Sequence, residues 1–351
     1  MTKTNPGHYF EDFHIGMEIR HATPRTVTAG DQALYQALYG PRFAVQSSDV
    51  YARAIGYPHA PLDDFLVFHI VFGKTVPDIS LNAVANLGYA ECRFLHAVYP
   101  GDTLTAVSRV VGVKENSNGK TGVVYVRSTG INQHDTPVLD YMRWVMVRKR
   151  DPASPAPEPT VPKALSVLTP DMLGDACPVI DPAAYDTILS GAPDLFGDYA
   201  VGERIDHVDG FTVEEAEHQM ATRLYQNTAR VHFNQFTEAQ GRFGQRLIYG
   251  GHVISLARTL SFNGLANAFQ IAAINGGRHV APLFAGETVF AWSEILSRDT
   301  LPGRDDVGAL RLRTIATKNR PCTDFPLKDT DDAYLPEVIL DLDYWVLLPS
   351  G

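Results

Sequence analysis

The chain has 351 residues, which is long for a single hydrophobic core, so two domains or two fused repeats are expected. Its net charge of −10 at pH 7 argues against a nucleic-acid partner, because such binding depends on concentrated lysine and arginine. Apolar stretches stop well before the roughly 18 residues of a membrane span, and the first residues, MTKTNPGHYFEDF, lack the apolar core of a signal peptide. We therefore expect a cytoplasmic protein with no membrane contact.

The three cysteines, Cys92, Cys177 and Cys322, are scattered without the CxxC spacing of a zinc site or the pattern of a disulfide framework. Buried free thiols are therefore expected. The sequence also has no glycine-rich phosphate loop after a strand and no cluster of His, Asp or Glu at metal-ligand spacing. These observations predict neither a metal nor a cofactor.

The first half of the chain reads as helices followed by strands. A polar segment leads to TVTAGDQALYQALYG at 26–40, where a threonine followed by an acidic residue is typical of a helix start. The apolar run FLVFHIVFGKTV at 65–76 predicts a buried helix. Segments rich in β-branched and aromatic residues predict strands at 102–115, 122–132 and 138–149.

The segment RDPASPAPEPTVPKAL follows, and its prolines favour an extended chain that continues neither a helix nor a central strand. It predicts a linker. We divide the chain into a first repeat at 1–150, a proline-rich linker at 151–194 and a second repeat at 195–351.

The second half repeats the first in one constant register, which we call the repeat register and which places Phe10 on Phe196. Ten identical pairs fall in it and join Phe10, Asp12, Gly16, Ile19, His21, Thr26, Val27, Leu38, Tyr39 and Val45 to Phe196, Asp198, Gly202, Ile205, His207, Thr212, Val213, Leu224, Tyr225 and Val231. A nearly gapless run of this kind indicates a duplicated domain. The same elements are predicted again, with helices at 212–226 and 252–271 and strands at 287–296, 308–317 and 338–348. We predict an α+β fold in which antiparallel strands wrap a central helix, twice over.

The densest group of candidate functional side chains lies in LYQNTARVHFNQF, which contains Asn227, Arg230 and His232. Farther along the chain, Gly250 and Gly251 precede the second buried helix. Glycines at a helix start let a substrate oxygen approach backbone N–H groups that have no partner within the helix. This arrangement predicts an oxyanion hole.

These residues resemble the MaoC-like hydratase family of the hotdog superfamily, in which an Asp is followed five residues later by a His, and later by Ile-x-His-Gly. His232, Ile248 and Gly250 match that pattern, whereas Asn227 replaces the Asp and Tyr249 replaces the second His. An amide cannot accept a proton from water. We therefore expect His232 to act alone as acid and base, or with a supplementary carboxylate; the candidates are Asp49, Asp63 and Asp64 of the first half.

The first repeat has lost the reacting groups. In the repeat register, Pro41 stands opposite Asn227, Gln46 opposite His232, and Asp64 opposite Gly250. We therefore expect one active site per chain, in the second repeat, with the first repeat shaping the acyl pocket.

The runs LYGPRFAVQSSD and TRLYQNTARVHF, among others, resemble the mesaconyl-CoA hydratases, also called β-methylmalyl-CoA dehydratases. The resemblance implies a double hotdog, a homodimer, and reversible hydration of mesaconyl-C1-CoA to β-methylmalyl-CoA in bacterial glyoxylate assimilation, such as the ethylmalonyl-CoA pathway. The CoA belongs to the substrate. That substrate carries a free carboxylate, so the pocket should hold a cation; Arg230 is the first candidate, followed by Arg42 and Arg278.

Other interpretations stay open. Asn227 holds the attacking water through its side-chain carbonyl or is a helix-capping or turn residue. The paired glycines form the oxyanion hole, a tight turn with positive φ, or both. Arg230 binds substrate or makes a surface ion pair. Asp63 and Asp64 assist catalysis or cap the first buried helix. Tyr249, Gly251 and Asp64 complete the set of residues predicted to bind the substrate. Two alternative functions are a hotdog acyl-CoA thioesterase and an acyl-CoA-binding protein without activity.

Overall fold

A computed structural model describes residues 3–351. The first half contains β1 (Glu18–Thr26), α1 (Ala29–Tyr39), α2 (Ala44–Ser47), α3 (Asp49–Ala54), α4 (Asp64–Thr75), a π-helical turn (Val76–Ser80), β2 (Ala83–Phe94), β3 (Thr103–Glu115), β4 (Thr121–Ile131) and β5 (Pro137–Arg148). After the linker, which holds α5 (Thr187–Ser190), come β6 (Arg204–Thr212), α6 (Glu215–Leu224), α7 (Gln235–Glu238), α8 (Gly250–Leu260), α9 (Phe262–Leu265), β7 (Gln270–His279), β8 (Thr288–Thr300), β9 (Val307–Lys318) and β10 (Val338–Pro349).

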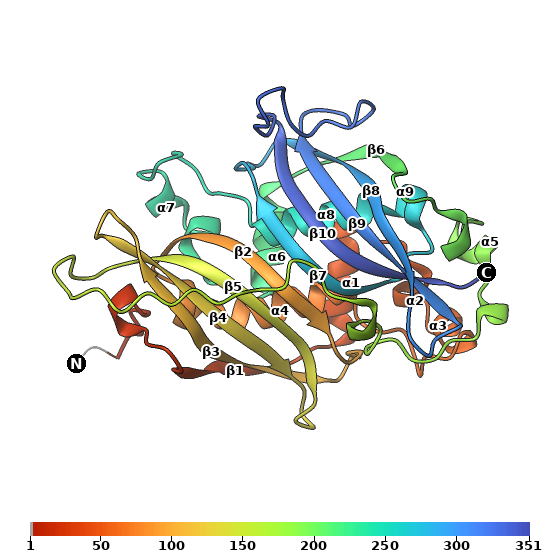
Figure 1. The fold of residues 1–351 in the computed structure, drawn as a ribbon, viewed down its shortest axis with the longest axis horizontal. Coiled ribbons are helices and arrows are strands. Elements are labelled where there is room, and N and C mark those ends of the chain that lie inside the picture. The colour runs from red at the N-terminus through yellow and green to blue at the C-terminus, as the bar shows by residue number, and fades with distance from the viewer. Residues whose placement is uncertain (1–2) are drawn as a thin grey trace.

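All ten of these strands form one antiparallel sheet in the order β1-β3-β4-β5-β2-β7-β10-β9-β8-β6 (Figure 1). Each repeat supplies five neighbouring strands. The two halves join where β2 pairs with β7, with Ala90 opposite Gly276 and Cys92 opposite Ile274. The predicted fold class and the double-hotdog architecture are confirmed.

The duplication is visible in the helices, which lie on one face of the sheet (Figure 1). The repeat register joins the first residue of α1 to that of α6, and the first residue of α4 to that of α8. The pseudo-twofold axis passes between equivalent residues of the two repeats. Across it, the Tyr225 hydroxyl donates to the Tyr39 hydroxyl at 2.7 Å, and His69 Nε2 lies 3.0 Å from Ser255 Oγ.

The central helices α4 and α8 form the core because nearly all their side chains are apolar or small. Every residue of α4 after Asp64 is buried, as is every residue of α8 after Gly250. α1 starts as predicted, with Thr28 and Asp31 forming a capping box, and ends at Gly40 with φ +63°. In the second repeat Thr212 is the last residue of β6 instead, and α6 begins at Glu215 without a side-chain cap.

The helix predicted at 252–271 is wrong in its second half. α8 ends at Leu260, and Asn263 and Gly264 have non-helical dihedral angles, Gly264 with φ +100°. From Gln270 onward the chain forms β7. Six of the strands, β3, β4, β5, β8, β9 and β10, are predicted from the sequence, whereas β1, β2, β6 and β7 are not.

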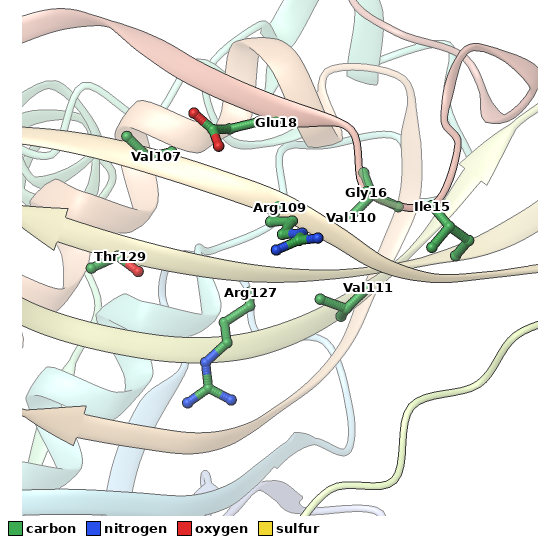
Figure 2. Close-up of a pocket in the computed structure, with 9 residues that line it drawn as sticks. All are labelled: Ile15, Gly16, Glu18, Val107, Arg109, Val110, Val111, Arg127 and Thr129. Atoms are coloured by element: carbon green, nitrogen blue, oxygen red, sulfur yellow. The ribbon is translucent and has the colours of Figure 1, made fainter.

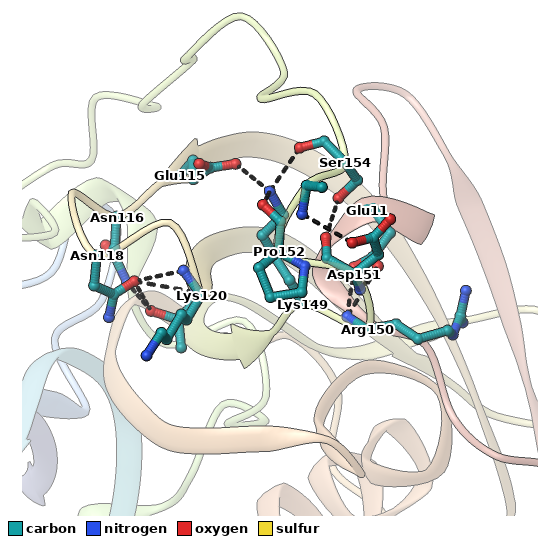
Figure 3. Close-up of polar contacts among 12 residues, drawn as sticks. Glu11, Glu115, Asn116, Asn118, Lys120, Lys149, Arg150, Asp151, Pro152 and Ser154 are labelled. Atoms are coloured by element: carbon teal, nitrogen blue, oxygen red, sulfur yellow. Dashed lines mark hydrogen bonds and ion pairs between the residues drawn. The ribbon is translucent and has the colours of Figure 1, made fainter.

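The linker is held against the sheet from its first residues (Figure 3). The Lys149 ammonium donates to Glu115 at 2.9 Å and to the carbonyls of Pro152 and Ser154 at 3.3 and 2.7 Å. Farther along, Thr160 makes a two-residue bridge with Val113 of β3. The linker therefore lies against part of the sheet face opposite α4 and α8 (Figure 1).

The three cysteines are free and buried, as predicted. Among residues 3–351, no helix combines the length and the apolar character that crossing a membrane requires.

Candidate active site

A cavity of about 390 Å³ lies between the two repeats. The second repeat contributes the segment from Asn227 to Gly250, the first turn of α8 and the end of β7. The first repeat contributes the end of α4 with its π-helical turn, β2, and Arg143 of β5. The cavity is therefore built by both repeats, and it contains the predicted residues Asn227, His232, Tyr249 and Gly250.

His232 ends a single 3-10 turn, Arg230–His232. Its ring Nδ1 lies 2.9 Å from the Leu247 carbonyl. Because a carbonyl only accepts hydrogen bonds, Nδ1 carries the proton and Nε2 keeps its lone pair. Burial lowers the pKa of His232 to about 4, against a partly compensating effect of the Leu247 bond. The ring is therefore neutral at pH 7, with one basic nitrogen free.

Gly250 is the first residue of α8, so its N–H has no acceptor within that helix. Tyr249, just before it, is fixed by donation of its N–H to His218 Nε2 at 2.9 Å. A Cβ on Gly250 would overlap the His279 ring, and one on Gly251 would overlap the rings of Tyr249 and His69. The N-terminal end of the helix thus brings backbone N–H groups and positive dipole to the cavity wall.

The expectation that these glycines form a turn with positive φ is wrong, because neither Gly250 nor Gly251 has a φ in that range. The close approach of aromatic rings requires glycine at both positions instead.

Asn227 lines the cavity and is 5% exposed. Its side-chain carbonyl accepts the N–H of Ala229 at 3.0 Å, so the predicted turn role is present. The carbonyl expected to hold a water is therefore already engaged with the backbone, although the residue faces the cavity.

The three predicted arginines do not come together at this cavity. Arg230 and Arg278 are exposed, and Arg42 is also exposed, with its guanidinium 4.4 Å from the centre of the Phe262 ring. None of the three lines the cavity.

The candidate carboxylates are all bonded to backbone N–H groups outside the cavity. Asp49 accepts the N–H of Ala60 at 2.8 Å, and Asp63 caps α4 by accepting the N–H of Phe65 at 2.9 Å. Asp64 accepts the N–H of Ile271 at 2.8 Å, and burial raises its pKa to about 8. The capping interpretation therefore holds for Asp63, whereas Asp64 bonds to β7 instead. Among the described residues, none that lines the cavity is an aspartate or glutamate.

Most residues that line the cavity were not among the predicted site residues, and the basic ones among them are His279, Arg143 and the exposed Arg242. His279, at the end of β7, packs against Gly250 and lies 3.2 Å through Nε2 from the Tyr89 hydroxyl. Arg143 is fully buried on β5. In the sequence it has the same strand parity as Leu139, Tyr141, Val145 and Val147, all of which are buried. A charged residue in phase with four core residues is a signal that could have identified it.

A second, shallower hollow of about 480 Å³ lies over β1, β3 and β4, on the face turned away from α4 (Figure 2). Arg109 and Arg127 line it, and Arg127 pairs with Glu91 at 2.7 Å and Asp140 at 2.5 Å. None of the predicted site residues lies there. Within residues 3–351, no group of three or more His, Cys, Asp or Glu side chains could hold a metal ion.

Comparison with solved structures defines the class of the protein. A MaoC domain protein dehydratase from Chloroflexus aurantiacus has a TM-score of 0.98, is 61% identical, and is covered completely, as is this chain. A Mycobacterium tuberculosis protein with a double hotdog fold has a TM-score of 0.73 and 26% identity, with 98% of each chain covered. The fold is that of a MaoC-like double-hotdog protein.

Sequence comparison narrows this class. A family model for mesaconyl-CoA hydratase matches residues 1–166. The β-methylmalyl-CoA dehydratase of Chloroflexus aurantiacus is 61% identical over 99% of this chain and 98% of its own length. The mesaconyl-CoA hydratase of Cereibacter sphaeroides is 60% identical over 99% of both chains. The chain belongs to the mesaconyl-CoA hydratase family of MaoC-like hydro-lyases.

Proposed function

We propose that this enzyme reversibly hydrates mesaconyl-C1-CoA to β-methylmalyl-CoA. The observation that carries the proposal is the pairing, in one cavity, of a neutral His232 with a free Nε2 and the N-terminal N–H groups of α8. The names of the two relatives at 60% and 61% identity supply the substrate. The absence of Asp and Glu from the described cavity lining favours an anionic substrate over a cationic one.

The reaction begins with polarisation of the enoyl thioester. The N–H of Gly250 donates to the thioester oxygen, and the negative charge that collects there makes the β-carbon electrophilic. Nε2 of His232 takes a proton from water, and the water oxygen bonds to the β-carbon. The enolate then takes a proton at the α-carbon from the His232 imidazolium. Water has been added across the double bond, and the ring is neutral again.

The same cavity is less suited to thioester hydrolysis. In hotdog thioesterases a carboxylate activates water against the carbonyl carbon, and the candidate carboxylates here are bonded to backbone N–H groups away from the cavity. With mesaconyl-CoA as substrate, loss of enoyl absorbance without release of free thiol is the expected result. Thiol release at the rate of enoyl loss would contradict hydration.

Replacing His232 by Ala should lower kcat by about 10²–10⁴-fold, because it removes the group that exchanges both protons. Turnover of mesaconyl-CoA is measured alongside the thermal unfolding midpoint. His96→Ala serves as the matched control, since His96 is exposed and outside the cavity. A His232→Ala enzyme that folds normally and keeps more than about a tenth of wild-type kcat would remove His232 from the mechanism.

A further inference from the structure

Arg143 is a buried cation without an anionic partner. It is 0% exposed, and within residues 3–351 no Asp or Glu forms an ion pair with it. Burial lowers the pKa of Arg143, against a partly compensating effect of Tyr141, Tyr89 and Tyr249. A buried charge without a counter-charge is costly, and proteins keep one mainly where a ligand supplies the missing partner.

The guanidinium is held in one orientation by neutral groups. Nη2 donates to Thr75 Oγ1 at 2.8 Å, and that hydroxyl itself donates to the Phe72 carbonyl at 2.7 Å. The guanidinium carbon stands 4.3 Å from the centre of the Phe72 ring. Nε and Nη1 have no acceptor, although both are buried. The group is therefore positioned in advance with donors left over.

Arg143 is part of the wall of the cavity that also contains His232 and Gly250. Asn86 of β2 lines the same cavity, and both its side-chain oxygen and its side-chain nitrogen are buried without a partner. Two polar side chains of the first repeat, each with buried unsatisfied groups, thus help to line the cavity in which the second repeat places His232 and Gly250.

The equivalent position in the second repeat is different. Arg143 pairs with Val126 of β4, and the counterpart of Val126 in the repeat register is Leu312 of β9, which pairs with Tyr344 of β10. Tyr344 is buried and neutral, and its hydroxyl lies 3.0 Å from Thr314 Oγ1. The fold therefore does not require an unpaired arginine here, because the second repeat has a hydrogen-bonded tyrosine, Tyr344, at the equivalent position.

We propose that Arg143, supported by Asn86, binds the free carboxylate of the substrate and sets the preference for a dicarboxylic acyl-CoA. This inference rests on the proposed function and assigns its specificity to the first repeat. In the substrate the carboxylate is attached to the β-carbon, so its capture fixes that carbon while the N–H of Gly250 fixes the thioester oxygen. Both ends of the enoyl unit are then held, one by each repeat. The arginines Arg230, Arg42 and Arg278 have no part in it.

The test compares ligands that differ only in the carboxylate. Mesaconyl-CoA is compared with tiglyl-CoA, in which a methyl group replaces the carboxylate, for kcat/KM. The saturated esters 2-methylsuccinyl-CoA and 2-methylbutyryl-CoA form the same pair for equilibrium binding. Arg143→Met should lower kcat/KM for mesaconyl-CoA and affinity for 2-methylsuccinyl-CoA at least about 100-fold, because a charge-assisted hydrogen bond is lost. Affinity for 2-methylbutyryl-CoA should stay within about threefold of wild type.

Two further variants separate this role from a structural one. Arg143→Lys keeps the charge and should recover part of the preference, and Arg143→Met should unfold at a temperature no lower than wild type, since it removes an unpaired buried charge. Arg230→Leu should leave the preference intact. An Arg143→Met enzyme that keeps the wild-type preference, or loss of the preference in Arg230→Leu, would overturn the assignment.

Failure of the proposed function would give different experimental results from failure of the Arg143 assignment. If the wild-type enzyme does not hydrate mesaconyl-CoA, the reaction is wrong, and the binding pair still tests Arg143. If hydration proceeds and only the preference of Arg143→Met is unchanged, the reaction stands and the carboxylate site is rejected.

Discussion

His232 has one ring nitrogen committed to the Leu247 carbonyl and one free, and burial keeps it neutral at pH 7. The low pKa makes the resting imidazole a modest base but makes the imidazolium a strong acid, which favours return of a proton to the α-carbon. Negative charge on the thioester oxygen raises the affinity of a neighbouring imidazole for a proton while the transition state lasts. One residue can therefore serve as base and acid in turn.

The pH dependence of kcat/KM follows from the same burial. With a pKa of about 4, His232 is fully in its basic form throughout pH 6 to 8, so kcat/KM should be nearly constant over that range. An ordinary histidine of pKa about 6.5 would make kcat/KM about fourfold lower at pH 6 than at pH 8. Initial rates with subsaturating mesaconyl-CoA decide between the two. A midpoint near 6.5 that disappears in His232→Gln would show that the ring is more solvated than its position implies.

Among the secondary-structure elements, the two central helices differ most at their first residue. α8 begins with Gly250, and α4 begins with its counterpart in the repeat register, Asp64. In α4 the N–H of Phe65 is already bonded to the Asp63 side chain, whereas the first N–H of α8 has no acceptor within its helix. The helix start is thus open to substrate in the second repeat and capped by a side chain in the first.

Replacing Gly250 by Ala should lower kcat/KM at least about 100-fold, because the new methyl group overlaps the His279 ring and moves the donor away from the thioester oxygen. Gly30→Ala in the first turn of α1 is the matched control. There the nearest atom to the new Cβ is Thr28 Oγ1 at 3.4 Å, so stability and kcat/KM should change little. Unchanged kcat/KM in Gly250→Ala would remove this helix start from the oxyanion hole.

The sequence predicts strands such as β3 and β8, in which one face is buried and the other is more exposed. β3 and β8 alternate because one face packs on helices, and both were predicted. β2 and β7 lie at the middle of the sheet, between the helices and the linker, and the first six residues of β7 are all buried. Burial on both faces removes the alternation and favours small residues, so the sequence gives no strand signal for β7, and the predicted helix extends into its first two residues, Gln270 and Ile271.

The sequence predicts the site residues that lie close to one another along the chain. His232 and Gly250 come together because one short segment connects them. Arg143 reaches the cavity through sheet pairing alone, and the long connection between β9 and β10 shifts its counterpart, Tyr344, out of the repeat register. Comparison of the two repeats in the sequence therefore could not show that Arg143 replaces a tyrosine.

At the scale of the whole molecule, two repeats of the same fold form one cavity to which each contributes different groups. Gln46, the counterpart of His232, donates through its amide to the Phe269 carbonyl at 2.7 Å and so joins the two repeats. Asp64, the counterpart of Gly250, also bonds across the repeats, to Ile271. At these two positions the first repeat has side chains that bond to the second repeat in place of reacting groups. The position of the second repeat therefore depends on contacts with the first.

The folded protein buries many neutral histidines, so its stability depends on pH. Burial lowers the pKa of six of them to between about 2 and about 4: His69, His207, His218, His232, His252 and His279. Below about pH 6.5 the unfolded chain binds these protons and the folded chain does not, so stability is present above that pH and is lost as the pH falls. Each proton contributes up to about 1.4 kcal/mol per pH unit. The raised pKa values of Asp63 and Asp64 oppose the effect, but two groups are outnumbered by six.

The free energy of unfolding should therefore decrease by several kcal/mol between pH 7 and pH 5. Urea unfolding at constant ionic strength, followed by circular dichroism, measures it. His207→Gln tests the cause away from the cavity, because His207 is bonded only to the Asn263 carbonyl and Ser293 Oγ among the described residues. This variant should show a shallower decrease with falling pH, by about one proton. A urea midpoint that is the same at pH 7 and pH 5 would mean that the buried rings exchange protons with solvent in the folded protein.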